Sequence, residues 1–470
     1  MKRYEEVAEQ IRGKIREGVL RPGERIPSVR QISQVMQVSV STVLHAYELL
    51  ENEGSIEIRP QSGHYVRAHF KAIPDEPKVS VPSKRSRQVD VSELAFEILN
   101  AIKQPEIVPL GSPFPSPELF PLGKLNQYLC NVGRRSTPWN TVTSLPPGND
   151  ELQRQIARRY LEQGCDIHPD DIVITCGAME ALNICLQAVA KAGDIIAVES
   201  PTFYASLHAI ERLGMRALEI PTHPREGIQL EALSDALKKH PVRACMLMST
   251  FQNPLGSTMP AEKKRALLKL LEQYNVPLVE DDVYQELYFG EEAPKPLKAY
   301  DTKGLVLHCS SFSKTLAPGY RIGWVSPGRY RERVLQLKFM TTLSTASLPQ
   351  LAIAEYLKHG GYEKHLRRVR QTLKYQQQMM VQQISQSFPE GTRVTRPEGG
   401  YVLWVELPEA VDALELYHQA LRHNISIMPG PVFSAQKKYG NCIRLNYGHH
   451  WGKPLANTVD LLGQLSKQEV

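Results

Sequence analysis

At 470 residues the chain is too long for one hydrophobic core, so its length predicts two or three domains. Its 56 Lys and Arg against 50 Asp and Glu leave a net charge of +6, which permits nucleic-acid binding without indicating it. Seven cysteines without a Cys-x-x-Cys pair argue against a disulfide framework or a zinc site. No apolar run of about 18 residues is present, which excludes a membrane-spanning helix, and the acidic N-terminal segment does not fit a secretory signal. We therefore expect a cytoplasmic protein.

The N-terminal part predicts three short helices followed by a β-hairpin. Apolar residues recur at helical spacing over residues 3–17, while Ser28 and Ser39 are placed to cap a second and a third helix. Residues 55–58 and 64–66 alternate as strands do. This is the pattern of a winged helix-turn-helix, whose third helix enters the major groove of DNA beside the wing. A small helical interaction module is the alternative.

The same stretch resembles the DNA-binding domain of the GntR family of bacterial repressors. The segments that carry the resemblance are 23–30 (GERIPSVR), 38–43 (VSVSTV), 46–54 (AYELLENEG) and 62–66 (SGHYV). The resemblance implies phosphate contacts at the start of the second helix, base contacts from the third helix, and a wing that approaches the minor groove. The residues that it assigns to DNA are Ser28, Arg30, Ser39, Ser41, Thr42, His45 and Gly63.

Two positions depart from the GntR pattern. Many relatives carry arginine where this chain has Val40, and some carry another where it has Leu44. Because arginine is the commonest reader of guanine, we expect this chain to use other base contacts and a different operator.

Residues 71–105 are predicted to link a DNA-binding domain of residues 1–70 to a larger domain of residues 106–470. Prolines make this segment semi-rigid, and residues 91–102 favour a short helix. The basic cluster at residues 84–87 is expected to be a solvated charge run, with a contact to the DNA backbone as the alternative.

From residue 107 onward, strand-like runs alternate with amphipathic helices, which predicts an α/β domain with a mostly parallel sheet. The predicted strands are residues 172–175, 195–199, 245–249, 278–281, 305–309 and 322–325. The predicted helices are residues 178–190, 206–213 and 261–274, and two helices within 350–386 that break at Gly360-Gly361. A smaller α+β subdomain is expected at the end, from residues 400–407, 414–423 and 442–446.

Ligands of open parallel sheets bind at the carboxyl ends of the strands, so the residues that follow each predicted strand are candidates. Gly177 opens a helix that could hold an anion, or it makes a plain turn. Phe203 could stack on a planar ring or simply pack, and Asn253 presents an amide or marks an Asn-Pro turn. Asp281 ends a buried strand and suits a positively charged ring nitrogen. A metal at residues 280–282 is disfavoured because no histidine accompanies them.

Lys314 follows the fifth predicted strand, and Ser311 and Arg321 flank it. A lysine in a dry pocket loses its proton readily and forms a Schiff base with an aldehyde, while serine and arginine bind phosphate. Taken alone, the stretch could equally be a surface loop. A lysine, phosphate-binding groups, an aspartate and an aromatic ring at successive strand ends together predict a pyridoxal-phosphate (PLP) site.

Residues 106–460 resemble class I/II aminotransferases of fold-type I, with the motifs SFSKTLAPGYRIGW (311–324), NPLG (253–256) and DDVY (281–284). The resemblance implies that Lys314 holds the internal aldimine and that Arg444 binds a substrate or effector carboxylate. The cofactor-binding residues that it implies are Gly177, Ala178, Phe203, Asn253, Asp281, Tyr284, Ser311, Lys314 and Arg321.

Thr143 departs from this family. Relatives often carry tyrosine there, which reaches the cofactor phosphate of the neighbouring subunit, so the departure puts one cross-subunit contact in doubt.

The whole chain resembles the MocR-type regulators, in which a GntR-type DNA reader is joined to an aminotransferase-like domain. The resemblance implies a homodimer that binds a double-stranded DNA operator and senses PLP or an amine or amino-acid effector, without contact to a membrane. A catalytically active aminotransferase with an appended DNA-binding domain is the alternative, because the core cofactor residues are present.

Overall fold

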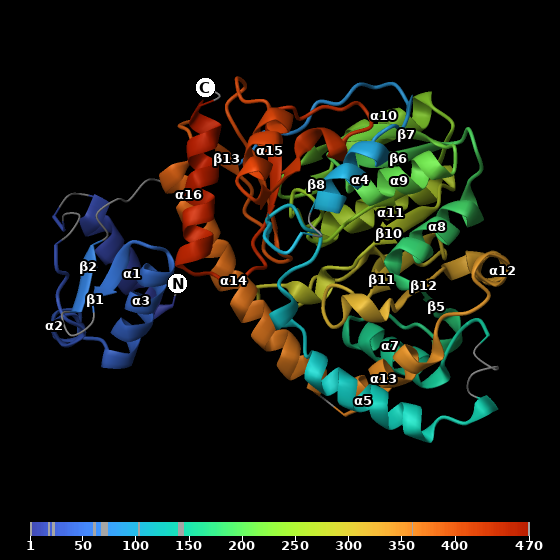
Figure 1. Ribbon diagram of the computed structural model, residues 1–470, viewed down its shortest axis with the longest axis horizontal. Coiled ribbons are helices and arrows are strands. Elements are labelled where there is room, and N and C mark those ends of the chain that lie inside the picture. The colour runs from blue at the N-terminus through green and yellow to red at the C-terminus, as the bar shows by residue number, and fades with distance from the viewer. Residues whose placement is uncertain are drawn as a thin grey trace.

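The computed structural model describes residues 2–16, 19–20, 24–59, 63–66, 74–101, 104–139, 145–359 and 361–468. A small N-terminal domain lies beside a much larger body, and the C-terminal helix runs between them in the view of Figure 1. Thr143 and the tip of the predicted wing, residues 60–62, lie outside the described residues.

The N-terminal domain has the predicted winged helix-turn-helix fold. Its elements are α1 (Arg3–Arg16), α2 (Val29–Val35), α3 (Val40–Asn52), β1 (Ile56–Arg59) and β2 (Gly63–Val66). Ser28 and Ser39 cap α2 and α3 as predicted, each accepting a hydrogen bond from a backbone N–H of the first turn. The inner face of α3 packs against α1 and the hairpin, with Val43, Ala46, Tyr47 and Leu50 all buried.

The described part of the predicted linker lies on the larger domain. There β3 (Arg87–Gln88) pairs antiparallel with β7 (Arg216–His223), and α4 (Ser92–Ala101) confirms the predicted short helix. Nearer the N-terminal domain, the backbone oxygen of Asp75 accepts a hydrogen bond from the N–H of Val394 at 2.8 Å. Backbone pairing therefore holds this segment against two different parts of the larger domain.

A nine-stranded sheet forms the centre of the larger domain, in the order β3-β7-β6-β9-β10-β11-β12-β5 with β8 on the side of β7. The strands not yet given are β5 (Val173–Thr175), β6 (Ile195–Ser200), β8 (Gly227–Ile228), β9 (Val242–Leu247), β10 (Leu278–Asp281), β11 (Val306–Ser311) and β12 (Gly323–Ser326). The pairs from β7 through β11 are parallel, while β12 runs against both of its neighbours. The predicted mostly parallel sheet is thus confirmed.

Helices surround this sheet, and α8 packs against β10, β11 and β12. The helices of this domain are α5 (Leu122–Arg135), α7 (Asp150–Glu162), α8 (Gly177–Val189), α9 (Tyr204–Arg212), α10 (Leu230–Lys239), α11 (Ala261–Tyr274), α12 (Arg331–Thr341), α13 (Ser347–Lys358) and α14 (Gly361–Ser387). No helix of the described segments is long and apolar enough to cross a membrane.

The smaller C-terminal subdomain is also present. It contains an antiparallel sheet of β13 (Arg393–Val394), β14 (Val402–Glu406), β17 (Cys442–Asn446) and β16 (Met428–Pro429), in that order. Two helices, α15 (Ala413–Arg422) and α16 (Lys453–Gln468), pack with it, and β15 (Ile425–Ser426) pairs with β4 (Val108–Pro109).

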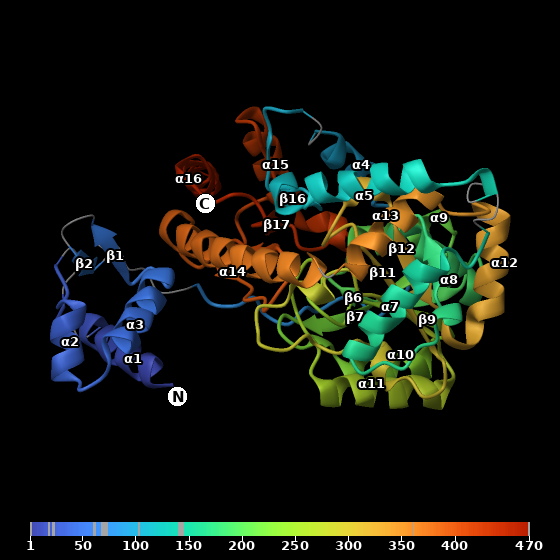
Figure 2. The ribbon, with the colours of Figure 1, turned by 90° about the horizontal axis from the view of Figure 1, so that it is seen from below.

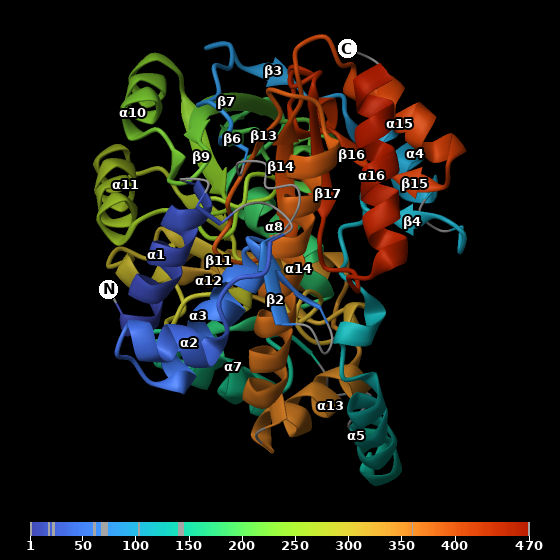
Figure 3. The same cartoon turned by 90° about the vertical axis from the view of Figure 1, so that its left-hand side faces the viewer.

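Helix α14 extends from the larger domain to the DNA-binding domain. Its 27 residues begin beside α5 and α13, and its far end lies next to α16 and the N-terminal domain (Figures 1 and 2). Gly54, just after α3, has the φ of +73° that favours glycine, and a Cβ there would lie 2.3 Å from Nε2 of Gln382 on α14. Figure 3, which looks onto the N-terminal domain, shows α3 in front of α14.

Candidate functional site

The predicted DNA-contacting residues of α2 and α3 are exposed, apart from one that is half-buried. Ser28 and Arg30 are exposed at the start of α2, and Ser39, Ser41 and His45 are exposed along the first half of α3. Thr42 is half-buried, and its hydroxyl lies 2.7 Å from the Ser39 hydroxyl. The end of α3 that approaches α14 is the opposite end, so that contact leaves the predicted reading face free.

Val40 and Leu44, the two departures from the GntR pattern, are also exposed on α3, at 48% and 44%. They lie four residues apart and therefore share one side of the helix. Apolar side chains in a major groove contact the thymine methyl group, which arginine at these positions would not do.

Arg25 is a further candidate that motif reasoning did not single out. Gly63 at the base of the wing has a φ of +103°, and a Cβ there would lie 3.3 Å from the Arg25 guanidinium. Arg25 is exposed and forms a β-bridge with Tyr65 of the wing. A guanidinium beside the wing is suited to a phosphate of the DNA backbone. In the sequence, the feature that could have indicated this role is the position of Arg25 in the segment GERIPSVR, directly before Ile26.

Lys314 projects from the loop after β11, and its amine is held by a segment distant in sequence. Its Nζ donates a hydrogen bond to the backbone oxygen of Pro113 at 2.8 Å and lies 4.1 Å from the centre of the Phe114 ring. Part of the side chain is solvent-accessible, but protein surrounds the amine. This burial lowers the pKa of Lys314 to about 7, against the opposing effect of the Asp281 carboxylate. A large fraction of the amine is therefore uncharged and nucleophilic at neutral pH.

Asp281 is the last residue of β10 and is 2% exposed. Its Oδ1 has no hydrogen-bond partner among the described residues. Burial, together with the neighbouring charge of Asp282, raises the pKa of Asp281 to about 7. A buried carboxylate oxygen without a donor is costly, so this position suits a ligand that brings a positively charged N–H.

Arg321, Ser311 and Gly177 converge at the start of α8. Arg321 Nη1 donates to Ser313 Oγ at 3.2 Å, and Nη2 donates to the backbone oxygen of Cys176 at 3.3 Å. Ser311 is 4% exposed and lies in the same turn as Ser313, whose N–H points to the Ser311 hydroxyl at 3.4 Å.

The first turn of α8, with Gly177 and Ala178, supplies backbone N–H groups without helical partners. These donors, the two hydroxyls and the guanidinium together form an anion site of the kind that holds a phosphate.

Asn253, Tyr284 and Arg444 form one buried chain of contacts. Asn253 Nδ2 donates to the Tyr284 hydroxyl at 3.3 Å, and Asn253 Oδ1 accepts from Arg444 Nη1 at 3.4 Å. Arg444 is fully buried on β17, where Nη2 also donates to the backbone oxygens of Gly111 and Ser112. Its Nε has no partner among the described residues, so the guanidinium keeps a donor available for a carboxylate.

Phe203 is connected to the other candidate residues through its neighbour Tyr204. It caps α9, is half-buried, and its ring lies 4.7 Å from that of Tyr204. Tyr204 is buried, and the charge of Arg444 acts on its hydroxyl, so this aromatic pair borders the same region.

Motif reasoning missed the segment from Gly111 to Phe114. Its carbonyl groups accept from Arg444 and Lys314, and Pro113 also accepts from the Tyr401 hydroxyl at 2.8 Å. The segment lies about sixty residues before β5 and has no motif of its own apart from the SPFPSPELFP stretch that it begins. Only the fold shows that it covers the lysine.

The residues present fit PLP. The orphaned Asp281 oxygen suits the pyridine nitrogen, the anion site at α8 suits the phosphate, and the uncharged amine of Lys314 suits the aldehyde. Gly177 is part of this fit, because a Cβ there would lie 2.3 Å from Arg321 Nη2 and would displace the guanidinium.

Comparison with known families identifies both halves of the chain. Residues 3–66 match the model for bacterial regulatory proteins of the gntR family, and residues 135–453 match the model for aminotransferases of class I and II. The latter family implies pyridoxal phosphate as the cofactor.

The similar proteins comprise regulators and enzymes. Over all 470 residues and the whole length of both chains, the sequence is 47% identical to the uncharacterized HTH-type transcriptional regulator YdcR of Escherichia coli K12. It is 39% identical to YjiR of the same organism over 95% of each chain. Among solved structures, α-aminoadipate aminotransferase LysN from Thermus thermophilus, complexed with N-(5′-phosphopyridoxyl)-L-leucine, superposes with a TM-score of 0.74 at 29% identity, over 81% of this chain and 96% of LysN.

Proposed function

We propose a function from the premise that this chain belongs to the MocR-type regulators, which join a GntR-type DNA-binding domain to a class I/II aminotransferase domain. It is a DNA-binding transcriptional regulator whose aminotransferase-like domain binds PLP and senses PLP or an amine or amino-acid effector. The observation that carries this function is the coexistence, in one chain, of an open α3 reading face and a buried amine of lowered pKa beside an unpartnered carboxylate.

In the cofactor site, Lys314 would attach PLP, and Asp281 would hold a proton at the ring nitrogen. Bound PLP would supply an aldehyde that exchanges between primary amines. Tyr284 and Asn253 would contact the ring hydroxyl, and Phe203 would lie against the ring. Gly177, Ala178, Ser311 and Arg321 would hold the phosphate.

Effector recognition rests on Arg444. An amino-acid effector would place its carboxylate on this guanidinium, at the unpartnered Nε and in competition with the backbone oxygens of Gly111 and Ser112 for Nη2. The segment from Gly111 to Phe114 would therefore move when an effector enters, and the Lys314 amine would lose its contact with Pro113. Binding would thus couple chemistry at Lys314 to a change in backbone position.

The DNA contacts follow the assignment made for the GntR family. Ser28 and Arg30 would contact phosphates, the Ser39, Ser41, Thr42 and His45 side chains would face bases in the major groove, and Gly63 would let the wing approach the minor groove. Val40 and Leu44 add apolar contacts that favour thymine.

The linker of residues 71–105 would couple effector binding in residues 106–470 to the position of the DNA-binding domain of residues 1–70. The linker is bonded to the central sheet through β3 and to the C-terminal subdomain through Asp75 and Val394. Closure of that subdomain around an effector would pull on the linker and change how the two DNA-binding domains of a dimer are spaced. An effector can cause this only if it binds the two arrangements with different affinities.

The homodimer is supported by apolar side chains on the surface of the large domain. Phe339, Met340 and Leu343 at the end of α12 are 56%, 63% and 49% exposed. Exposed apolar patches of this kind mark interfaces in soluble proteins. Two subunits would bring two winged helices to one operator.

The alternative function is an active aminotransferase with an appended DNA-binding domain. It is favoured by a buried Arg444 with a free Nε, which can seat an amino-acid substrate. The two functions differ in whether the amine is converted to a carbonyl product over many cycles, with its amino group passed to a second carbonyl compound, or instead changes the affinity for DNA.

The decisive experiment is a gel-shift titration on the DNA upstream of the protein's own gene, with and without PLP and a panel of amines and amino acids. Regulation predicts that PLP or one amine changes the apparent affinity for DNA, or the pattern of shifted complexes. Multiple-turnover transamination, with DNA binding unaffected by cofactor and by every amine, would instead establish the enzyme.

A further inference from the structure

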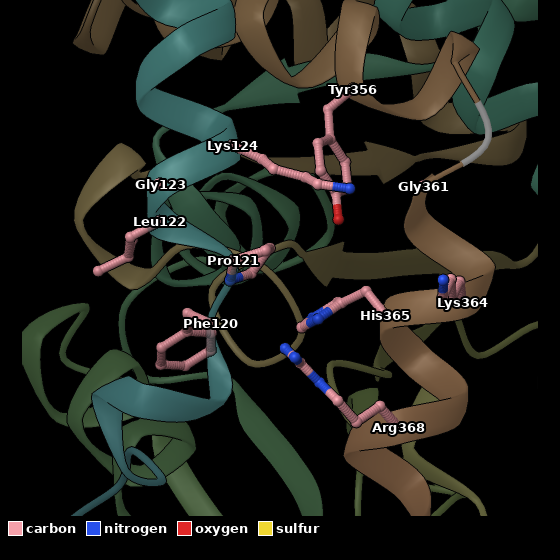
Figure 4. Close-up of a pocket in the computed structure, with 10 residues that line it drawn as sticks. All are labelled: Phe120, Pro121, Leu122, Gly123, Lys124, Tyr356, Gly361, Lys364, His365 and Arg368. Carbon is pink, nitrogen blue, oxygen red and sulfur yellow. The ribbon is translucent and has the colours of Figure 1, made fainter.

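A second cationic pocket lies between the start of α5 and the first turns of α14, away from the anion site at α8. Its volume is about 340 Å³. An engineered cavity of about 150 Å³ holds a benzene ring, so this volume admits a phosphate group with a small organic substituent. Figure 4 shows the Lys124 side chain reaching from α5 toward Tyr356, with His365 and Arg368 projecting from α14 on the other side.

The pocket collects positive charge without balancing acids. Lys124, Lys364 and Arg368 line it, and within the described chain none of their side chains has a hydrogen bond or an ion pair. None of its ten lining residues, all of them described, is Asp or Glu. The nearest acid along α14, Glu363, lies on a different side and pairs with Arg159 and Arg370.

Two helices begin at this pocket. Leu122 and Gly123 of α5 and Gly361 of α14 are among its lining residues and belong to first turns, whose backbone N–H groups lack helical partners. The positive ends of both helix dipoles therefore add to the side-chain charges and favour an anion here.

His365 identifies which anion fits. It is 5% exposed, and its Nε2 lies 2.7 Å from the backbone oxygen of Thr315. A carbonyl oxygen can only accept, so Nε2 carries the hydrogen and Nδ1 of the neutral ring is left as an acceptor. Nδ1 is buried and has no partner among the described residues. Burial, with a contribution from Arg368, lowers the pKa of His365, although its bond to Thr315 and the charge of Glu286 oppose the shift.

The ligand must therefore be negatively charged and still donate one hydrogen bond. A carboxylate or sulfate at neutral pH has only acceptors, whereas inorganic phosphate and protonated phosphate monoesters keep an O–H group. We propose that this pocket binds a phosphate group that keeps one proton, with Lys124, Lys364 and Arg368 on its charged oxygens and His365 Nδ1 accepting its O–H.

Hydrogen bonds would connect the bound phosphate to the loop that carries the cofactor lysine. His365 bridges the pocket to Thr315, the residue after Lys314, and the Tyr362 hydroxyl of α14 lies 2.7 Å from the Thr315 hydroxyl. The site itself requires neither DNA binding nor an effector at Lys314, so its test is independent of the proposed function.

The test compares inorganic phosphate with sulfate by isothermal titration calorimetry. The full-length protein is loaded with PLP and desalted, so that the cofactor fills the anion site at α8. We expect phosphate to bind at least roughly 10-fold more tightly than sulfate, because sulfate leaves His365 Nδ1 unpaired. Equal affinities for the two anions, or no saturable phosphate binding, would overturn the proposal.

Variants locate the binding. Arg368→Gln should weaken phosphate binding by roughly 10-fold or more, whereas Arg367→Gln, which removes the same charge from an exposed residue lining a different groove, should leave it unchanged. The same loss in both variants would mean that only the general charge of α14 matters and would refute the site. If Arg368→Gln fails to fold, Lys124→Gln, in an exposed residue of α5, takes its place.

His365→Lys tests the discrimination itself. The ammonium group keeps an N–H donor for Thr315 and has no acceptor. The preference for phosphate over sulfate should then fall toward one, while sulfate still binds. A preserved preference for phosphate would show that His365 Nδ1 does not accept a hydrogen bond from the phosphate O–H. A phosphate monoester that binds more tightly than phosphate would support a phosphorylated small molecule as the natural ligand.

Discussion

Arg321 occupies the space that a side chain on Gly177 would need: a Cβ on Gly177 would lie 2.3 Å from Arg321 Nη2. Both residues have a left-handed φ, +75° at Gly177 and +54° at Arg321. A non-glycine residue in this region costs about 1 kcal/mol or more, so the strain at Arg321 is offset by its bonds to Ser313 and Cys176.

Gly177→Ala should therefore weaken PLP binding by at least about 10-fold, because the new methyl group would move the guanidinium away from the phosphate. The matched control is Gly193→Ala, since Gly193 has a similar φ of +86° but no atom within 4 Å of its Cβ position. Both variants should lose about 1 kcal/mol of unfolding free energy, and only the first should lose cofactor affinity. Fluorescence titration with PLP and urea unfolding of the apo-protein measure the two effects; equal PLP affinities in the two variants would contradict this role of Gly177.

Lys314→Ala should abolish the visible absorption of lysine-bound PLP and leave the affinity for operator DNA largely intact, because the lysine lies in the other domain. Lys303→Ala, at an exposed lysine before the same strand, is the control. Absorption spectra and a DNA titration of each variant provide the readout. Retained visible absorption in Lys314→Ala would refute the assignment.

Attachment of PLP to the apo-protein should depend on pH through Lys314. Because its pKa is lowered to about 7, the reactive uncharged amine increases as pH rises from about 6 to 8 and is nearly complete above that. The rate, followed by stopped-flow absorbance, should rise over that interval and then level off. An ordinary lysine, with a pKa near 10.4, would give a rate that still rises steeply at pH 9.

Arg30→Gln should weaken binding to all DNA sequences to a similar degree and reduce the slope of log affinity against log salt by about 1, as the loss of one phosphate contact does. Fluorescence anisotropy at several salt concentrations measures both quantities on the operator and on unrelated DNA. A changed preference between operators would instead place Arg30 on a base.

Phe339→Glu combined with Met340→Glu should convert the dimer to a monomer, because each change places a charge in an apolar interface. Sedimentation velocity of the purified variant measures the oligomeric state. Leu161→Glu, at a leucine of α7 that is 66% exposed, provides the control. A dimer of unchanged strength in the double variant would exclude the α12 surface as the interface.

The sequence singled out candidate cofactor residues by their place in the predicted sheet. Lys314 follows a buried apolar strand and Asp281 ends one, and parallel strands end at one edge of a sheet. Strand β7 was missed because Arg216 and Glu219 interrupt its apolar pattern, and Glu219 is nonetheless buried, where it accepts from the N–H of Ala435.

Long-range contacts account for the rest of what the sequence could not predict. The bond from Lys314 to Pro113 joins residues 201 positions apart, and no local periodicity encodes it. The same holds for the linker: its prolines predicted a semi-rigid segment, but its pairing with β7 and Val394 depends on surfaces formed by distant segments. His365 gave no signal at all, because a single histidine in an amphipathic helix is usually only packed.

Helix α14 contacts the loop of Lys314 at one end and the domain that carries α3 at the other. With 27 residues it is about 40 Å long. A tilt of only 3° about its first turn, where His365 and Tyr362 hold Thr315, would displace its far end by about 2 Å. Since Gly54 lies against the Gln382 side chain on α14, such a tilt would shift the surface on which the DNA-binding domain rests and change the angle at which α3 meets DNA.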